Sequence, residues 1–372
     1  MSDSIIHSDS TCSLRVDLKI IEENYKTLLR KCDNAEVGAS IKANAYGLGA
    51  DRIAPILKHS GCNHFFVSSC DEGISLRKIL GPEADIYVLK GIFRSELEYF
   101  TEHNLTPVLN DLWQIELWQK YAFSLSKKLP CFVHIDTGMY RLGIPPSEVI
   151  NLLNHDDISN LDIRCIMSHL TSSEDSSSPS NQEQLALFNK YSSKFDKAKR
   201  SLANSSGIFL GKEYHFDLTR AGAAIYGINP TPYLKESPVK NPIELTAPII
   251  AIRDLPQLGS VGYNGTFTNK YDHARTIATI PIGYADGFPR ISSNKVSLHI
   301  DGIEAPVIGL ISMDLTIIDV SNIPYTKLFL GQRVEILGEN STPDKLAKLC
   351  STNSYEILTM LGYRHKKIYS TL

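Results

Sequence analysis

The chain has 372 residues, of which 42% are apolar and 21% are charged, a balance that excludes a wholly disordered protein. The net charge of −3, from 38 basic and 41 acidic residues, favours neither a nucleic-acid partner nor a membrane surface. No apolar run approaches the ~20 residues that cross a bilayer. A length above ~200 residues predicts two domains.

Cysteine usage and the start of the chain indicate the compartment. The seven cysteines are odd in number and include no Cys-x-x-Cys pair, which disfavours a disulfide framework and a zinc site. The first ten residues, MSDSIIHSDS, contain neither the basic nor the apolar region of a secretory signal. These observations predict a cytoplasmic protein without a bound metal.

Helical patterns alternate with short apolar runs from about residue 15 to 238. Strands are predicted at 36–41, 64–68, 85–89, 106–109, 131–135 and 162–167, with weaker signals near 202–204 and 216–218. Helices are predicted between them, at 18–32, 51–60, 71–80, 95–102, 111–125, 146–154 and 181–200. About eight such units predict an α/β fold with a (β/α)8 barrel of the TIM type. A doubly wound parallel sheet is the alternative.

The pattern changes after Pro238. Short strand-like runs separated by Gly, Pro, Asn and Asp are predicted as strands at 244–253, 276–282, 296–300, 306–320 and 333–337. One helix is predicted at 344–349. The sequence therefore predicts a barrel domain over 15–238 and a mainly β domain over 239–372.

The segment Ile41-Lys42-Ala43-Asn44-Ala45-Tyr46-Gly47-Leu48-Gly49 carries the first chemical signal. Lys42 directly follows the first predicted barrel strand, at the mouth where barrel enzymes hold their active sites. A lysine partly removed from water loses its proton more readily. The uncharged amine can then form a Schiff base with an aldehyde cofactor. The alternative for a lone lysine is an exposed side chain whose stem lies along the surface.

Taken whole, this segment resembles the pyridoxal-phosphate lysine motif of the alanine racemases. The resemblance extends from Val16 to Tyr363 and is carried, in the family's order, by Asp136–Gly143 (DTGMYRLG), Ser168-His169-Leu170, Asn204-Ser205, Thr219–Gly227 (TRAGAAIYG), Gly262-Tyr263, Ile280–Gly287 (IPIGYADG), Ser312-Met313-Asp314 and Tyr355-Glu356. It implies a pyridoxal-phosphate barrel followed by a β domain that the N-terminal segment 1–14 joins. It also implies a homodimer with shared active sites that interconverts L-alanine and D-alanine and so supplies D-alanine for peptidoglycan.

The resemblance also implies two catalytic residues. Lys42 would hold the cofactor and move the α-proton on one face of the substrate, and Tyr263 of the partner subunit would do so on the other. An unperturbed phenol has a pKa of ~10, so Tyr263 needs help to act as a base. His169 and Arg220 resemble the family's supporting hydrogen-bond chain. The alternative for Tyr263, which lies in a Gly-Tyr-Asn-Gly loop, is a packing aromatic.

The binding residues follow from the same resemblance. The implied cofactor-binding set is Lys42, Tyr46, Leu89, His169, Ser205, Arg220, the backbone amides of Gly222 and Ala223, and Tyr355. Within it, Arg220 would face the pyridine nitrogen, and Leu89 would line the ring pocket. The implied substrate-binding set is Arg141, Met313 and Tyr284. Tyr284 and Tyr355 would narrow the entrance to fit a methyl side chain.

Position 134 departs from the family pattern. Well-known family members carry a lysine there that becomes carbamylated and orients the arginine that matches Arg141. His134 is not expected to supply that carbamate, and the imidazole itself, a chloride ion or water remain as alternatives. Leu48 replaces a common histidine and Leu310 replaces an arginine of the outer entrance.

Competing functions remain open on the sequence alone. An amino-acid decarboxylase shares the barrel-plus-β architecture, but it lacks this combination of Asp-Thr-Gly-Met-x-Arg and Ile-Gly-Tyr-Ala-Asp-Gly. A racemase that acts on serine, or on a broader range of amino acids, is a closer alternative than a decarboxylase. A non-catalytic pyridoxal-phosphate carrier is the third alternative, and the β domain with Tyr263 argues against it.

Overall fold

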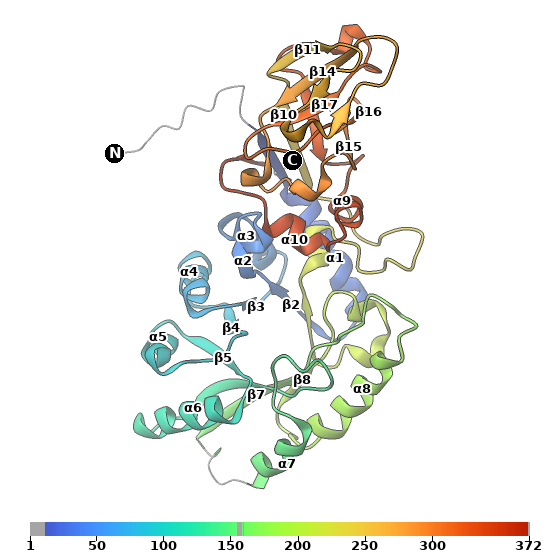
Figure 1. The fold of residues 1–372 in the computed structure, drawn as a ribbon. Helices are drawn as coiled ribbons and strands as arrows, with labels where there is room; N and C mark the ends of the chain where they lie inside the picture. The colour runs from blue at the N-terminus through green and yellow to red at the C-terminus, as the bar shows by residue number, and fades with distance from the viewer. Residues whose placement is uncertain (1–11, 155–157, 159, 371–372) are drawn as a thin grey trace, which may run out of the picture. The chain divides into compact units, whose positions relative to one another are not determined.

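A computed structural model describes residues 12–154, 158 and 160–370 of the chain. Most of the predicted N-terminal segment 1–14 therefore lies outside the described residues. The chain divides into two compact units, one of Ile21–Lys240 and one of Met1–Ile20 together with Asn241–Leu372. Figure 1 follows both along the chain. Within the described residues, no helix has the length and apolar character to span a membrane.

Among the described residues of Ile21–Lys240, eight parallel strands form one sheet, in the spatial order β8-β7-β6-β5-β4-β3-β2-β9. They are β2 (Glu36–Ser40), β3 (His64–Val67), β4 (Asp85–Val88), β5 (Leu105–Leu109), β6 (Leu129–His134), β7 (Leu161–Met167), β8 (Lys199–Ser201) and β9 (Leu218–Ala221). The helices of the unit lie outside the ring of strands (Figure 1): α1 (Leu18–Cys32), α2 (Lys42–Tyr46), α3 (Ala50–His59), α4 (Cys70–Leu80), α5 (Leu97–Glu102), α6 (Leu112–Ser124), α7 (Pro146–Asn154) and α8 (Pro179–Ser192).

The two ends of this sheet meet, so the predicted barrel is confirmed and the doubly wound alternative is not. The Asp217 amide donates to the Arg200 carbonyl (3.1 Å), and the Ser201 hydroxyl donates to the Leu218 carbonyl (2.5 Å). These bonds join the β8 end to the β9 end and nearly close the barrel. Parallel strands in a barrel bring their carboxyl ends to one mouth.

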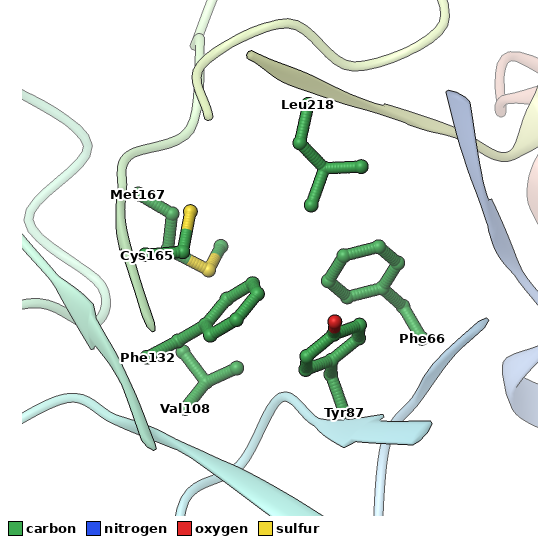
Figure 2. Packing of buried hydrophobic residues seen from close by; sticks show 7 residues of the cluster. All are labelled: Phe66, Tyr87, Val108, Phe132, Cys165, Met167 and Leu218. Carbon is green, nitrogen blue, oxygen red and sulfur yellow. The ribbon is translucent and has the colours of Figure 1, made fainter. Parts of the chain in front are cut away.

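Side chains fill the barrel interior. Phe66, Tyr87 and Phe132 stack along one side, with ring centroids 4.9 Å apart for the first pair and 4.2 Å apart for the second. Figure 2 shows them pointing toward one another together with Val108, Cys165, Met167 and Leu218. A packed interior is typical of this barrel. It leaves chemistry to the loops at the mouth.

The second unit is mainly β. One sheet has the order β16-β15-β18-β10-β1-β19, a second β11-β14-β17 and a third β12-β13. Its strands are β1 (Ser13–Asp17), β10 (Ile243–Pro248), β11 (Ala251–Leu255), β12 (Ser260–Val261), β13 (Phe267–Thr268), β14 (Arg275–Ile280), β15 (Ser297–Ile300), β16 (Ile303–Pro306), β17 (Thr316–Asp319), β18 (Arg333–Leu337) and β19 (Lys366–Ser370). Its helices are α9 (Pro343–Cys350) and α10 (Ser354–Thr359).

Several predicted elements differ from those observed. The run 244–253 forms two strands, because its hydrogen-bond partner changes after Ile249. The Ile249 carbonyl accepts from the Gly331 amide (2.8 Å) beside β18, whereas the Ile250 amide donates to the Thr279 carbonyl (2.9 Å) in β14. The run 306–320 is extended only at its ends. Between them Gly309 adopts a φ of 75°, where a Cβ would lie 3.0 Å from Val261. The helix predicted at 181–200 ends at Ser192, and α10 was not predicted.

Candidate active site

The barrel mouth gathers the predicted site residues of the first unit. Lys42 follows β2, Leu89 follows β4 and His169 follows β7, while Arg220 lies in β9 and Arg141 in the loop after β6. The positive charge of Arg141 acts on Lys42 and His169, and that of Arg220 acts on His169. The fold therefore brings these cationic and titratable groups close enough for the charge of one to shift the pKa of another.

Lys42 immediately precedes a turn whose residues have a left-handed backbone conformation. Residues 43–46 all have φ between 53° and 55°, a left-handed conformation that costs ~1–2 kcal/mol for each non-glycine residue. The Asn44 side chain accepts a hydrogen bond from the Ala50 amide (2.8 Å) and ties the turn to α3. Consecutive strained residues that the surroundings hold in place are typical of functional sites.

Glu72, in α4, fixes the same turn from the outside. One carboxylate oxygen accepts from the Ala43 amide (2.8 Å) and the other from the Ser68 amide (2.7 Å). Burial, followed by the charge of Arg141, lowers the pKa of Lys42, and the Glu72 carboxylate opposes that shift. A lower pKa increases the fraction of uncharged amine available as a nucleophile or base.

Arg220 is buried and held on several sides. Nη1 donates to the Ser201 hydroxyl (2.6 Å). Nη2 donates to the carbonyls of Ser168 (2.5 Å) and Leu202 (3.3 Å) and lies 3.3 Å from His169 Nδ1. Burial lowers the pKa of Arg220 to about 10, so the guanidinium keeps its charge at neutral pH. Its Nε donates to no residue within the described part of the chain, so the Nε–H remains for a further acceptor.

The contact with Arg220 fixes the tautomer of His169. A guanidinium has no acceptor, so His169 Nδ1 must accept from Arg220 through a bare lone pair. Burial and then the charge of Arg220 hold the pKa of His169 well below its usual range. The ring is therefore neutral, and its Nε2 carries the proton.

Small groups and hydroxyls cluster beside the end of β9. The Ser205 hydroxyl accepts from the amides of Gly222 (2.8 Å) and Ala224 (3.2 Å), and Ala223 lies between these two residues. A Cβ at position 222 would lie 2.7 Å from the Tyr46 hydroxyl, so the close approach of the backbone to Tyr46 requires glycine. Amides and hydroxyls in such a cradle are the donors that bind an anionic oxygen.

The loop that carries Arg141 is shaped by Asp136. The Asp136 carboxylate accepts from the amides of Gly138, Met139 and Tyr140, each at 2.9 Å. Arg141 itself is exposed. The sequence motif Asp-Thr-Gly-Met-Tyr-Arg therefore folds as one tight turn that presents the guanidinium at the mouth.

The remaining predicted residues belong to the other unit. Tyr263 begins a short 3₁₀ turn, Tyr263–Gly265, and is 67% exposed. It lines a cavity of about 680 Å³ together with Arg253 and Leu310. Tyr355 lies in α10 and is partly buried.

Tyr284 and Met313 lie on two segments that touch. The Tyr284 amide donates to the Ser312 carbonyl (3.1 Å), and the Ala285 amide donates to the Met313 carbonyl (3.0 Å). A Cβ at Gly283 would lie 2.3 Å from the Met313 oxygen, which explains the first glycine of Ile-Gly-Tyr-Ala-Asp-Gly. Both side chains are exposed.

Sequence reasoning missed the residues that support the mouth. For Glu72 a local signal existed, because Ser69 lies three residues before it in the pattern Ser-x-x-Glu, and the Ser69 hydroxyl accepts from the Glu72 amide (3.4 Å). For Asn110 and Gln184 there was none. Gln184 donates to the Thr137 hydroxyl (3.1 Å) and to the His169 carbonyl (2.9 Å) from α8.

Comparison with known proteins points to one family. Its sequence models, described as the alanine racemase N-terminal and C-terminal domains, match residues 16–230 and 243–369. An alanine racemase of Rickettsia akari is 48% identical over 361 residues, which cover 97% of this chain and 99% of that protein. One of Rickettsia bellii is 50% identical over 338 residues, 91% of this chain and 82% of its own. A crystal structure of alanine racemase from Bartonella henselae with covalently bound pyridoxal phosphate has a TM-score of 0.93 at 37% identity, covering 97% of this chain and 99% of that chain.

Proposed function

The chain belongs to the alanine racemase family, and from this membership we propose that it is an isomerase that interconverts L-alanine and D-alanine with pyridoxal phosphate. The observation that carries the proposal is the barrel mouth itself. There Lys42 is partly buried and has a lowered pKa. Its charge and those of Arg141 and Arg220 all act on His169.

The residues at the mouth fit the cofactor. Lys42 offers an amine, and Arg220 has an Nε–H that no described residue accepts. Ser205, Tyr46 and the backbone of Gly222 and Ala223 lie together, and the Ser205 hydroxyl, which accepts from the Gly222 amide, keeps its own hydrogen to donate to a phosphate. We assign these residues, with Leu89, His169 and Tyr355, to cofactor binding. The bound cofactor supplies an electron sink for the pair left when the α-proton is removed.

We assign the two proton transfers to Lys42 and Tyr263. Each side chain holds a proton on a terminal atom, Nζ or the phenolic oxygen, and each would serve one face of the α-carbon. Arg220 would donate a hydrogen bond to the cofactor without giving up its proton. His169, bonded to Arg220, would extend that chain through its Nε2–H.

Substrate selection would rest on a second set of residues. Arg141 carries a permanent positive charge at the mouth and suits the carboxylate of an amino acid. Met313 would offer its backbone amide to the same carboxylate. Tyr284, beside Met313, would limit the side chain to one of about the size of a methyl group.

We further propose a cytoplasmic homodimer with shared active sites, which supplies D-alanine for peptidoglycan. Lys42 and Tyr263 belong to different units, and all seven cysteines are buried thiols, as suits a reducing compartment. The working domains would be the barrel over 15–238 and the β domain over 239–372. The pairing of Ser13 and Leu14, in β1, with β10 and β19 supports our placing the described end of segment 1–14 in the β domain.

A chiral assay tests the proposed function. Purified protein is incubated with L-alanine, D-alanine and L-serine, with and without added pyridoxal phosphate, and both enantiomers are quantified. We expect each alanine enantiomer to yield the other, and serine to react far more slowly. Equal turnover of serine would make this a broader racemase. Release of carbon dioxide without the opposite enantiomer would make it a decarboxylase.

Borohydride reduction tests the cofactor assignment. Reduction fixes pyridoxal phosphate onto the amine that holds it, and peptide mapping identifies the residue. We expect the label on Lys42 and none on a Lys42→Ala protein. A label on another lysine in the unmodified chain would contradict the assignment.

A further inference from the structure

Two short turns of the β unit carry the groups that we assign to substrate selection. Residues 283–287 form the Tyr284 turn, and residues 312–315 form the Met313 turn. The amides of Tyr284 and Ala285 donate to consecutive carbonyls of the Met313 turn, at 3.1 and 3.0 Å. Two backbone bonds side by side join the turns along one line but do not by themselves prevent rotation about that line.

Arg364 makes the next link between the turns with its side chain. One residue further along each turn lie Asp286 and Asp314, whose ionised carboxylates can accept hydrogen bonds but not donate them. Arg364 Nε lies 2.8 Å from Asp286 Oδ1, and Arg364 Nη1 donates to Asp314 Oδ1 at 2.8 Å. One guanidinium therefore bridges the two turns. We call this contact the Arg364 clamp.

Asp286 is the buried half of the clamp. Its side chain is 9% exposed, against 58% for Asp314. The second oxygen of Asp286, Oδ2, accepts from the Gly283 amide (2.9 Å), so this carboxylate closes the Tyr284 turn on itself. Arg364 is the cation that pairs with it within the described residues. Because a buried carboxylate is costly without a charged partner, the guanidinium holds the Tyr284 turn in place.

The segment that carries Arg364 packs directly on the same turn. The Asp286 carbonyl accepts from the Gly362 amide (3.1 Å). A Cβ at Gly287 would lie 2.2 Å from the Met360 carbonyl oxygen, so the two backbones meet with no space for a side chain. Arg364 thus extends toward Asp314 from a backbone that is already fixed against the Tyr284 turn.

The Met313 turn has fewer supports. The Ser312 amide donates to the Leu315 carbonyl (3.0 Å), and so does the Ser312 hydroxyl (2.9 Å). Between these two residues, the Asp314 carboxylate bonds to no described residue except Arg364. The Met313 amide, which we assign to the substrate carboxylate, donates to no residue in the part of the chain that the structure describes. The direction of that amide therefore depends on how Asp314 is held.

We propose that Arg364 is a positioning residue for substrate selection, because by bonding Asp286 and Asp314 at once it keeps the Tyr284 side chain and the Met313 amide at a fixed spacing. A fixed spacing limits the substrate side chain to about a methyl group, whereas a looser one admits a hydroxymethyl group. The inference rests on the proposed function for the substrate, and on the observed contacts alone for the clamp.

Asp314→Ala tests the clamp with the least disturbance of the fold. It removes an exposed carboxylate and leaves Arg364 paired with the buried Asp286. Pockets discriminate against one added group by ~10–200-fold, and a loosened pocket gives up part of that discrimination. We expect the ratio of kcat/KM for L-serine to that for L-alanine to rise at least about fivefold, mainly through KM, since Lys42 and Tyr263 are untouched. An unchanged ratio, or a loss confined to kcat, would overturn the proposal.

Two arginine variants separate positioning from general stability. Arg364→Met removes the whole clamp. Arg275→Met removes a matched ion pair of the same unit, in which Arg275 Nη2 lies 2.7 Å from Oδ2 of the buried Asp319. Each variant leaves a buried carboxylate unpaired, so the thermal unfolding temperature of both holoenzymes should fall. We expect only Arg364→Met to raise the serine-to-alanine ratio. An equal rise in both variants would show that the ratio follows stability and would overturn the proposal.

A double substitution tests whether Arg364 acts through Asp314. Once Arg364→Met has removed the guanidinium, adding Asp314→Ala should change the serine-to-alanine ratio by less than twofold, since the two residues act as one unit. Independent, multiplying effects would contradict the clamp. If Arg364→Met does not fold, Asp314→Ala decides the question alone, because it keeps the buried carboxylate paired.

Hydrogen exchange of the holoenzyme gives a readout that does not depend on activity. The bonded amides of Tyr284 and Ala285 exchange when the two turns separate, and mass spectrometry of peptides that cover residues 283–287 follows them. We expect Asp314→Ala to speed this exchange several-fold and Arg275→Met to leave it unchanged. Unchanged exchange in Asp314→Ala would overturn the inference even if alanine is racemised. Conversely, faster exchange in a protein that does not racemise alanine would contradict only the proposed function.

Discussion

Two histidines at the barrel mouth, both neutral because burial lowers the pKa of each, carry their protons on opposite ring nitrogens. His169 Nδ1 accepts from Arg220, so its proton is on Nε2. His134 Nδ1 faces the oxygen of Asn110, whose nitrogen donates to two carbonyls, so His134 Nδ1 donates and its Nε2 is bare. The same side chain therefore serves as a donor in one place and an acceptor in the other. The difference comes entirely from the residue that contacts Nδ1.

Loss of the Tyr263 phenol should remove one proton route without removing the cofactor. Tyr263→Phe keeps the ring, so packing should change little. General acid–base groups contribute ~10²–10⁴-fold in rate, and we expect racemisation to fall by at least that order. Deuterium uptake from solvent should persist, slowly, in the enantiomer whose α-proton faces Lys42 and almost cease in the other. Equal uptake by both enantiomers in this variant would mean that one base reaches both faces.

The pKa of Lys42 should move in opposite directions when its two charged neighbours are removed. Arg141 lowers this pKa and Glu72 raises it. Arg141→Gln should therefore shift the midpoint of the pH–rate profile for pyridoxal-phosphate attachment to the apoenzyme upward, and Glu72→Gln should shift it downward. At neutral pH the Glu72 variant should react faster than the unmodified protein. Shifts of the same sign in both variants would point to altered burial and count against the charge effect.

Residues tied to a local motif could be predicted from the sequence, and residues that act from a distance could not. Lys42 follows a strand whose apolar run is plain, so its place at the mouth was predictable. Glu72 bonds Ala43 from 29 residues away, and Asn110 bonds His134 from 24 residues away. Neither pair leaves a periodic signal, because each contact exists only once the barrel has formed.

At the scale of elements, the strained turn of residues 43–46 gives a stability prediction. Glycine occupies the left-handed region freely, whereas a β-branched residue is disfavoured there. At Ala43, which is exposed, glycine should leave the free energy of unfolding unchanged or slightly higher. Valine should lower it by ~1–2 kcal/mol, as measured by urea unfolding of the apoenzyme.

A matched substitution shows whether this result reflects the turn. Ala186 is exposed within the right-handed helix α8. Ala186→Gly should destabilise the protein by ~0.5–1 kcal/mol. A similar loss for glycine at both positions would contradict the left-handed conformation at position 43.

The displaced strands show why element boundaries failed at one side of the barrel. The last two strands were predicted near 202–204 and 216–218, but they lie at Lys199–Ser201 and Leu218–Ala221. Lys199 and Arg200 read as the end of a helix, and Arg220 interrupts an apolar run. Phe216 has a φ of 51° and so cannot begin a regular strand. Arg220, the charged residue that interrupts the strand pattern of β9, is also the buried side chain that we assign to the cofactor site.

At the scale of the whole molecule, the two proposed bases are carried by different units of one chain. Lys42 belongs to the barrel unit and Tyr263 to the β unit. Alternation of strands and helices up to residue 238 made the change of architecture predictable, because period and turn composition both shift there. The pairing of β1 with β10 and β19 across most of the chain length is a tertiary fact that no local pattern indicates.

If the active sites are shared between subunits, two inactive proteins should complement each other. A heterodimer of Lys42→Ala and Tyr263→Phe has one site that lacks both residues and one in which both are intact. With free exchange of subunits, equal mixing should restore about a quarter of the unmodified activity, since half the dimers are mixed and each has one working site. The control is the double variant Lys42→Ala/Tyr263→Phe mixed in excess with unmodified protein. Shared sites predict that it suppresses activity, because every mixed dimer then lacks one residue at each site. Sites confined to single subunits predict the reverse in both experiments: no recovery in the first and no suppression in the second.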